Sequence, residues 1–218
     1  LKDPKSDIAE AYAAIRASLA ISFADGLPKR ILFTSTSASE GKSVSCMALA
    51  LATARTGKRV VVLDADMRRP SQNSLFEVDN ARGVSDLLSG SADIPGVIRT
   101  TDAPGLTLIT TGPKPTNPAE LLAADHLDPV LSKLEELYDH IFIDGPPILG
   151  LADAVELANV SDRTILLVRS GENPPARIRA SVQRINLAQG KIAGIILSRF
   201  DARKSGYGTN YDYEYRYG

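Results

Sequence analysis

Residues 34–43 read TSTSASEGKS, and they join two segments of different character. The preceding residues, Arg30–Ser35 (RILFTS), form the short apolar run that is typical of a buried strand. The following residues, Lys42–Arg55 (KSVSCMALALATAR), indicate a helix, and Gly57 then supplies its stop signal. A polar loop that ends in Gly-Lys-Ser between a strand and a helix predicts a phosphate-binding loop.

The chemistry of this loop would come from its backbone amides and two side chains. Backbone N–H groups at a helix N-terminus, together with the helix dipole, favour anionic oxygens. We expect Lys42 to reach the terminal phosphates, Ser43 to ligate Mg²⁺ through its hydroxyl, and Gly41 to allow a close approach of the backbone. The residues expected to bind nucleotide are Ser37, Ala38, Ser39, Glu40, Gly41, Lys42, Ser43 and Val44.

Two further apolar strands end in acidic residues. Residues 60–70 (VVVLDADMRRP) place Asp64 and Asp66 after one strand, and residues 141–147 (IFIDGPP) place Asp144 after another. Ligands of open α/β sheets bind beyond the carboxyl ends of the strands, where a carboxylate can hold Mg²⁺ directly or through water. Three such strand ends in one chain predict a Mg²⁺–nucleotide site. The expected metal ligands are Ser43, Asp66 and Asp144.

The remaining pattern predicts the α/β class, a mostly parallel sheet with helices on both faces, because fully apolar strands alternate with helices. An amphipathic helix over 7–23 precedes it. Further strands are expected at 59–64, 106–110, 140–144, 164–168 and 192–197. Helices are expected at 84–88, 119–138 with a break at Pro129, 153–158 and 176–188.

Composition limits the class of protein. The 218 residues suit one domain, and 25 basic against 26 acidic residues give a net charge of −1, which does not suggest nucleic acid as a partner. Cys46 is the single cysteine, so no internal disulfide can form and a reducing compartment is expected. No apolar run approaches the 18 or so residues of a membrane span. The start at Leu1 suggests a part of a longer polypeptide.

The C-terminal segment differs from the rest of the chain. Residues after Ala202 include no aliphatic side chain, so we expect a flexible tail without a core of its own. Five of the seven tyrosines lie in the last twelve residues, which suits either a substrate for phosphorylation or an aromatic patch that docks on a partner: Tyr207, Tyr211, Tyr213, Tyr215 and Tyr217. The expected divisions are an N-terminal helix (1–28), the phosphate-binding domain (29–200) and the tail (201–218).

The three motifs together resemble Walker A, Walker A′ and Walker B of the bacterial tyrosine kinases (BY-kinases), a branch of the deviant P-loop ATPases. The resemblance implies a P-loop NTPase-like fold, ATP and Mg²⁺ as cofactors, and transfer of the γ-phosphoryl of ATP to tyrosines, chiefly in the tail of a neighbouring copy. Lys42, Asp64 and Asp66 would be catalytic. Tyrosine has an ordinary pKa of about 10, so its proton must leave during transfer. Asp64 is the first choice for accepting or orienting that proton, with Asp66 as the other candidate.

The resemblance also implies partners. The family's oligomerisation pattern is a Glu and two Args at three-residue spacing. Glu10 and Arg16 match it, and Ala13 stands at the middle position in place of an Arg, so a homo-oligomer is expected. An activating membrane protein of the chain-length-regulator type, fused or separate, would hold the domain at the cytoplasmic face of the bacterial inner membrane. The process served would be exopolysaccharide or capsule synthesis and export.

Three alternatives stay open at this point: a non-kinase ATPase switch, a nucleotide-binding scaffold and a small-molecule kinase. The tyrosine tail argues against the switch, as does Ser37, which stands where such ATPases carry a second lysine. Ala38 and Ser39 replace the Pro-Gly of the usual kinase loop, which leaves the scaffold open. Ser198 stands where relatives place an adenine-contacting residue, so no adenine contact is carried over.

Overall fold

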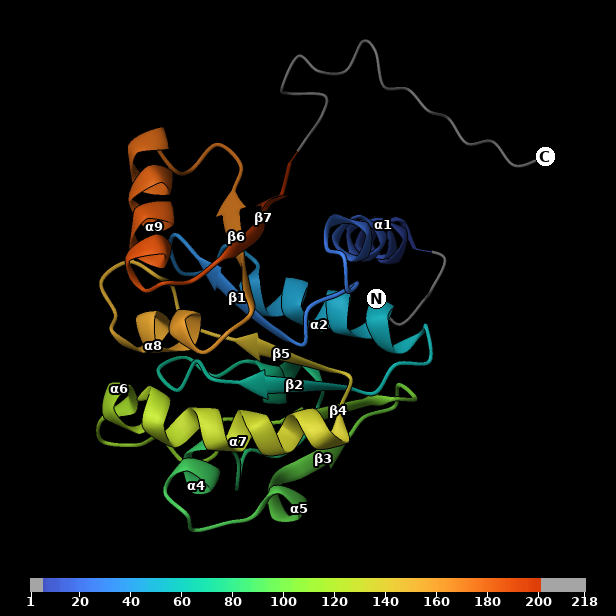
Figure 1. The fold of residues 1–218 in the computed structure, drawn as a ribbon, viewed down its shortest axis with the longest axis vertical. Coiled ribbons are helices and arrows are strands. Elements are labelled where there is room, and N and C mark those ends of the chain that lie inside the picture. The colour runs from blue at the N-terminus through green and yellow to red at the C-terminus, as the bar shows by residue number, and fades with distance from the viewer. Residues whose placement is uncertain (1–5, 201–218) are drawn as a thin grey trace, which may run out of the picture.

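The computed structural model describes residues 6–200 and shows a seven-stranded sheet with the order β3-β4-β2-β5-β1-β6-β7 (Figure 1). Each pair of neighbouring strands is parallel except β3 and β4, which confirms the mostly parallel sheet. The tail tyrosines lie outside the described residues. The strands are β1 Arg30–Ser35, β2 Val60–Asp64, β3 Ile98–Thr100, β4 Leu106–Ile109, β5 His140–Asp144, β6 Arg163–Arg169 and β7 Ile192–Ser198.

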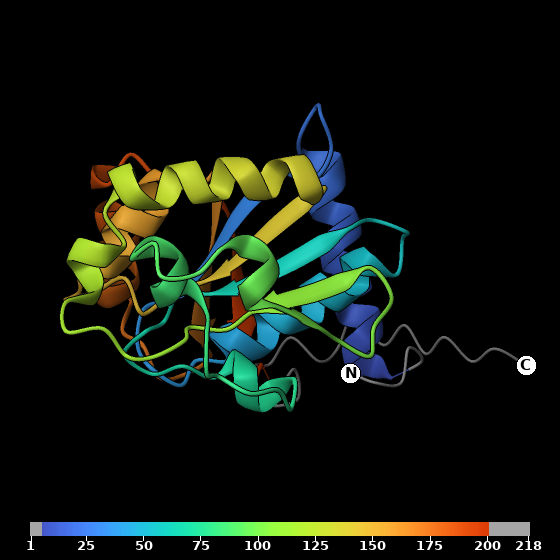
Figure 2. The ribbon, with the colours of Figure 1, turned by 90° about the horizontal axis from the view of Figure 1, so that it is seen from below.

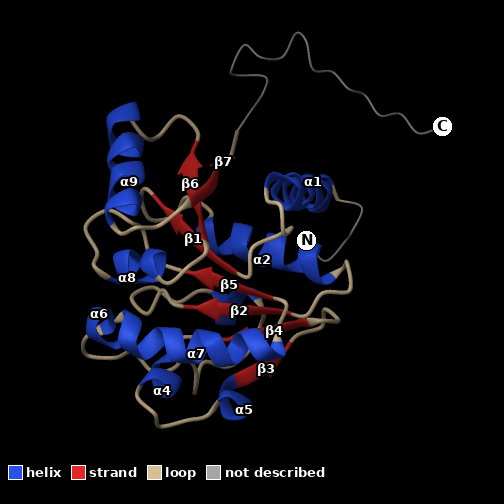
Figure 3. Cartoon of the chain, viewed as in Figure 1, coloured by secondary structure: helices blue, strands red, loops and turns tan. Residues whose placement is uncertain are grey.

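Helices cover both faces of this sheet (Figures 2 and 3). α1 packs on α2, and α2 packs on β1, β2 and β5, whereas α7 contacts β5, α8 contacts β1 and α9 contacts β7. No helix within residues 6–200 is both long and apolar enough to cross a membrane. The helices are α1 Asp7–Ser22, α2 Lys42–Ala54, α3 Gln72–Leu75, α4 Val84–Leu88, α5 Ile94–Val97, α6 Pro118–Leu121, α7 Ala124–Leu137, α8 Asp153–Asn159 and α9 Pro175–Leu187.

The alternation of side chains along the strands explains the two apolar layers. Successive residues of a strand point to opposite faces, so β1 contributes to both layers. Ile31 and Phe33 pack in one cluster with Leu49 of α2, and Leu32 packs in the other with Leu131 of α7. Cys46 lies fully buried in the α2 layer, as expected of a small core residue.

Strand register brings the acidic strand ends together. In the pairing of β2 with β5, Asp64 lies opposite Asp144, and in the pairing of β1 with β5, Phe33 lies opposite Asp144. The loop that follows β1 therefore leaves the sheet beside both carboxylates. This edge of the sheet is the place where the sequence predicts the nucleotide.

The predicted break at Pro129 is wrong. Pro129 lies inside α7, which continues from Ala124 to Leu137, and the interruption falls earlier, between α6 and α7. A proline removes one backbone hydrogen bond, but the fully buried Leu127, Leu131 and Leu134 hold this helix against the core. Tertiary packing thus outweighs the local cost of the proline.

Three short elements were not expected from the sequence. They are the antiparallel strand β3 and the helices α3 and α5. Each has only three or four residues, too few for an apolar periodicity to appear. α3 matters most for function because it begins directly after the acidic motif of residues 60–70.

Candidate active site

The loop after β1 ends at an uncapped helix N-terminus. Gly41 is the N-cap of α2, it has a φ of 88°, and no side chain caps the helix there. Ser39 also adopts a left-handed conformation, with a φ of 65°, so this serine takes the backbone angle that glycine would adopt freely. The first amides of α2 are thereby left for an anionic ligand.

Three residues hold the loop through Glu40, which is buried. The Glu40 carboxylate accepts hydrogen bonds from the Thr36 amide (3.0 Å) and from the Asn173 side-chain amide. Ser198, at the end of β7, donates its hydroxyl to the Glu40 carbonyl at 2.6 Å. Ser198 therefore fixes the phosphate-binding loop to the end of β7. Sequence reasoning missed Asn173 and this role of Ser198 because both residues lie far along the chain.

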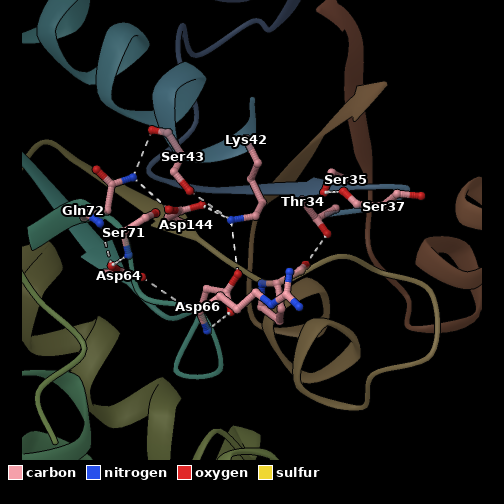
Figure 4. Close-up of polar contacts among 12 residues, drawn as sticks. Thr34, Ser35, Ser37, Lys42, Ser43, Asp64, Asp66, Ser71, Gln72 and Asp144 are labelled. Carbon is pink, nitrogen blue, oxygen red and sulfur yellow. Dashed lines mark hydrogen bonds and ion pairs between the residues drawn. The ribbon is translucent and has the colours of Figure 1, made fainter. Parts of the chain in front are cut away.

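Lys42 connects the loop with the carboxylates (Figure 4). Its Nζ lies 2.7 Å from Asp144 Oδ1, 3.4 Å from Asp66 Oδ2 and 3.2 Å from Ser43 Oγ. Burial alone would lower the pKa of Lys42, but the negative charges of Asp144, Asp66 and Asp64 outweigh it, and the pKa is raised. The lysine is therefore a permanent positive charge within the site.

Asp64 is fully buried and is held by backbone amides. Its Oδ2 accepts hydrogen bonds from the amides of Ser71 (3.1 Å) and Gln72 (2.9 Å), and its Oδ1 accepts one from the amide of Asp66 (3.3 Å). Burial, followed by the charge of Asp144, raises the pKa of Asp64 to about 7, against the opposing effect of these amides. Asp64 fixes the start of α3 and titrates near neutral pH.

Asp66 lies at the mouth of this cluster. Its Oδ1 accepts a hydrogen bond from the Arg69 amide at 3.1 Å, and its Oδ2 faces Lys42. Burial raises the pKa of Asp66, although Lys42 opposes the shift. The neighbouring Arg68 turns to Asp153, with nitrogen–oxygen distances of 2.7 and 3.0 Å. Asp66 is thus the more accessible of the two acids in the second motif, with 5% of its surface exposed against 0% for Asp64.

Gln72 completes the cluster, and no sequence motif marked it. Its Nε2 donates to Asp144 Oδ2 at 2.8 Å and to the Ser43 carbonyl at 3.0 Å. The side chain is fully buried, and its Oε1 has no hydrogen-bond partner within the described part of the chain. A polar residue at the first turn of a short helix gives no sequence signal of such a contact.

The structure brings the main predicted residues to one place and leaves others apart. The Lys42 ammonium joins Ser43, Asp66 and Asp144 (Figure 4). Asp64 lies opposite Asp144 in the sheet, but its carboxylate accepts from the backbone amides of Asp66, Ser71 and Gln72. Val44 follows on α2 with an exposed side chain. The proposed oligomerisation residues lie on α1, where Glu10 is exposed and Arg16 is half-buried.

The donor set suits Mg²⁺ that is shared with a nucleotide. One hydroxyl and two carboxylates are hard oxygen ligands, and Mg²⁺ usually combines one or two carboxylates with phosphates and water. Among residues 6–200 no group of three or more His, Cys, Asp or Glu side chains is arranged to hold a metal by itself. Ser43, Asp66 and Asp144 therefore fit an ion that arrives together with phosphate.

The fold and this site define the chain as a P-loop NTPase. The AAA domain family matches residues 29–189. The chain is 31% identical over 198 residues to the tyrosine-protein kinase YwqD of Bacillus subtilis, which covers 91% of this chain and 84% of YwqD. It is also 31% identical over 208 residues to the tyrosine-protein kinase wzc of Salmonella typhimurium, covering 95% of this chain and 29% of wzc.

A solved structure agrees with these sequence matches. The kinase domain of the Escherichia coli tyrosine kinase ETK superposes with a TM-score of 0.84 at 30% identity, covering 91% of this chain and 79% of that domain. The chain belongs to the bacterial tyrosine kinases within the AAA domain family. Its relatives include both proteins of similar length and proteins more than three times as long as the matched part.

Proposed function

We propose that this chain is an ATP-dependent protein-tyrosine kinase whose main acceptors are the tail tyrosines of a neighbouring copy. Membership of the bacterial tyrosine kinases supports the reaction class. The observation that carries the proposal is the cluster around Lys42, in which a lysine of the phosphate-binding loop meets Asp144 at 2.7 Å and Asp66 at 3.4 Å. The acceptors would be Tyr207, Tyr211, Tyr213, Tyr215 and Tyr217.

The loop residues would bind and orient ATP. Residues 37–44 would surround the phosphates with amides at the uncapped N-terminus of α2. Lys42 would turn from Asp144 towards the β- and γ-phosphates, where a fixed positive charge stabilises the charge that develops during transfer. Ser43, Asp66 and Asp144 would hold Mg²⁺, which when bound neutralises the phosphate oxygens.

The tyrosine hydroxyl must lose its proton during transfer, and two carboxylates compete for it. We propose Asp66 rather than Asp64 as the acceptor, through the carboxylate oxygen that does not bind Mg²⁺, since Asp66 is the more exposed acid and Asp64 already accepts hydrogen bonds from three backbone amides. Asp64 would then keep the loop in place. Asp66→Asn should lower kcat by about 10²–10⁴-fold. Asp64→Asn should mainly alter how kcat depends on pH. The reverse outcome would assign the proton transfer to Asp64.

The decisive experiment is incubation of the purified chain with ATP and Mg²⁺, followed by intact-mass measurement and mapping of the modified residues. Successive additions of single phosphates within residues 207–217 are expected. Lys42→Met should abolish them, while Lys133→Met, at an exposed lysine of α7, should leave them unchanged. Hydrolysis of ATP without labelled tyrosine would instead indicate the ATPase switch.

Transfer between copies has its own test. An extended chain reaches at most about 3.5 Å per residue, so a tail of 18 residues is long enough to enter an adjacent site. A chain that ends at residue 200 would serve as the enzyme, and full-length Lys42→Met would serve as the acceptor. Labelling of the acceptor supports transfer in trans, and labelling only in full-length active protein would contradict it.

The cellular setting is proposed from the same family. The kinase would act in exopolysaccharide or capsule synthesis, at the cytoplasmic face of the inner membrane, as a homo-oligomer assembled through residues 1–28. A chain-length-regulator-like membrane protein would activate it, and the length of wzc relative to this chain suits a fused arrangement. Complementation of a capsule-deficient kinase mutant by the wild type, but not by Lys42→Met, would support this setting.

A further inference from the structure

We propose that Gln72 is a positioning residue of the phosphotransfer site, which sets the orientation of Asp144 and of the start of α2 towards a metal-bound nucleotide. This inference rests on the proposed function, because it gives a task to residues that the proposal assigns to Mg²⁺. Gln72 is the first residue of α3 and is fully buried, between the acidic ends of β2 and β5 (Figure 4). No motif of the family pattern quoted above includes it.

The orientation of the Gln72 amide follows from its partners. The carboxylate oxygen of Asp144 and the carbonyl oxygen of Ser43 are both acceptors, and each lies within 3.0 Å of Nε2. Both amide hydrogens are therefore used. The flipped amide would place Oε1 against two acceptor oxygens and lose both hydrogen bonds. Only one orientation satisfies this site.

The same side-chain orientation leaves Gln72 Oε1 without a partner among the described residues, and this cost in stability points to a function. Gln72 Oε1 is buried and has no hydrogen-bond partner among residues 6–200. An unsatisfied buried acceptor destabilises the fold, but an apolar side chain in its place would leave the buried Asp144 Oδ2 without the donor that Gln72 provides. Polar groups that are kept in spite of such a penalty tend to mark functional sites.

Gln72 also connects three elements of the site, β2, β5 and α2. Its backbone amide donates to Asp64 at 2.9 Å, so β2 fixes one end of the residue while its side chain holds Asp144 at the end of β5. Asp144 uses Oδ1 for Lys42 and Oδ2 for Gln72. When Lys42 turns to the phosphates, Gln72 remains as the described side-chain partner that keeps Asp144 aligned.

The test compares nucleotide binding with and without the metal. Gln72→Met has nearly the same shape but no donors, and a fluorescent ADP analogue would report affinity in excess Mg²⁺ and in EDTA. Loss of a residue that orients metal ligands typically weakens metal binding about 10–100-fold. We expect the gain in affinity that Mg²⁺ gives the wild type to fall by that factor in Gln72→Met. The affinity in EDTA should change by less than about threefold.

The matched control is Thr53→Val. Thr53 is a buried residue of α2 whose hydroxyl donates to the Leu49 carbonyl at 2.8 Å, away from the site. This variant should lose stability but keep the full Mg²⁺-dependent gain. If Gln72→Met fails to fold, Gln72→Asn, whose amide is one methylene shorter, takes its place with the same expected loss.

The outcomes separate the two proposals. A wild type without any Mg²⁺-dependent gain contradicts the proposed function itself. If the wild type shows that gain and Gln72→Met shows the same gain, the proposed role of Gln72 is overturned. Equal losses in Mg²⁺ and in EDTA would make Gln72 a general support of the fold, which overturns the inference as well.

Discussion

Lys42 Nζ and Asp144 Oδ1 lie 2.7 Å apart, and both side chains are buried at the carboxyl edge of the sheet. Before nucleotide arrives, the lysine offsets part of the negative charge of three carboxylates, Asp64, Asp66 and Asp144. We propose two successive tasks for this ammonium: it pairs with the carboxylates, and it then binds the phosphates of the nucleotide.

Removing this charge should separate stability from activity. Lys42→Met leaves buried carboxylates without their counter-charge, and loss of one partner of a buried pair typically costs about 3–5 kcal/mol. Lys42→Arg keeps the charge and should retain most of the stability, yet lose phosphotransfer because a guanidinium is a larger, planar donor. Urea unfolding and phosphotyrosine assays of both variants measure the two effects. Equal stability of Lys42→Met and wild type would contradict the first task.

The raised pKa of Asp64 predicts how stability depends on pH. The unfolded carboxyl titrates near 3.8 and the folded one at about 7. Between these values the folded chain keeps a proton that the unfolded chain has released, so the free energy of unfolding falls as pH rises. Across the window this amounts to about 4 kcal/mol at most, an order-of-magnitude figure.

Asp64→Asn tests this relation because asparagine does not ionise. Relative to wild type, the variant should gain stability steadily from pH 4.5 to pH 7.5 in a window set by the two pKa values, measured by urea unfolding. Asp102→Asn, at an exposed carboxylate, is the matched control. A difference between wild type and Asp64→Asn that stays constant with pH would exclude the raised pKa.

The supports of Glu40 predict effects on nucleotide affinity. Ser198→Ala removes the hydroxyl that donates to the Glu40 carbonyl, and Asn173→Ala removes the amide that donates to its carboxylate. Each should cost about 1 kcal/mol of stability and weaken ADP binding several-fold, because the loop loses a fixed contact. Calorimetric titration with ADP measures the affinity, with Ser18→Ala on α1 as control. Unchanged binding in both variants would show that the loop is fixed without them.

Substitutions on the exposed face of α1 should change the oligomeric state of the protein. Glu10 and Ala13 are exposed and three residues apart, so they share one face of the helix. Glu10→Ala should shift the protein towards monomer, and Ala13→Arg, which restores the family's basic position, should favour larger oligomers. Sedimentation velocity measures both, with Glu136→Ala on α7 as control. Identical sedimentation of all four proteins would remove α1 from the interface.

Phosphorylation of the tail should weaken the same assembly. Each phosphate adds about −1.5 to −2 charges at neutral pH, so five modified tyrosines carry about −8 to −10. Neighbouring tails would then repel one another and any nucleotide-filled site. Protein treated with ATP should sediment as smaller species than the phosphatase-treated protein. A variant with phenylalanine at all five tail tyrosines should show no such difference.

The sheet and the loop could be predicted because their signals are local. Apolar runs such as residues 59–64 indicate strands, and a strand–loop–helix with Gly-Lys-Ser marks the phosphate site without knowledge of the fold. The convergence of Lys42, Asp64 and Asp144 followed from the rule that parallel strands end at the same edge of a sheet. The structure confirms that convergence.

The parts that could not be predicted depend on contacts between distant residues. Glu40 meets Asn173 and Ser198, which lie 133 and 158 residues away, and no local pattern reveals such pairs. Gln72 reaches Asp144 across 72 residues in the same way. The error at Pro129 has the opposite origin, since a local rule was applied where the buried leucines of α7 decide the conformation.

Because Cys46 is buried, its reactivity can report how often α2 separates from the sheet. Burial raises the pKa of this thiol well above its ordinary value, so the native chain holds almost no reactive thiolate. Cys46 is the single cysteine of the sequence and lies three residues after Ser43 on α2. The rate at which a thiol reagent modifies the protein would therefore measure how often α2 lifts from the sheet, and bound ATP should slow that rate.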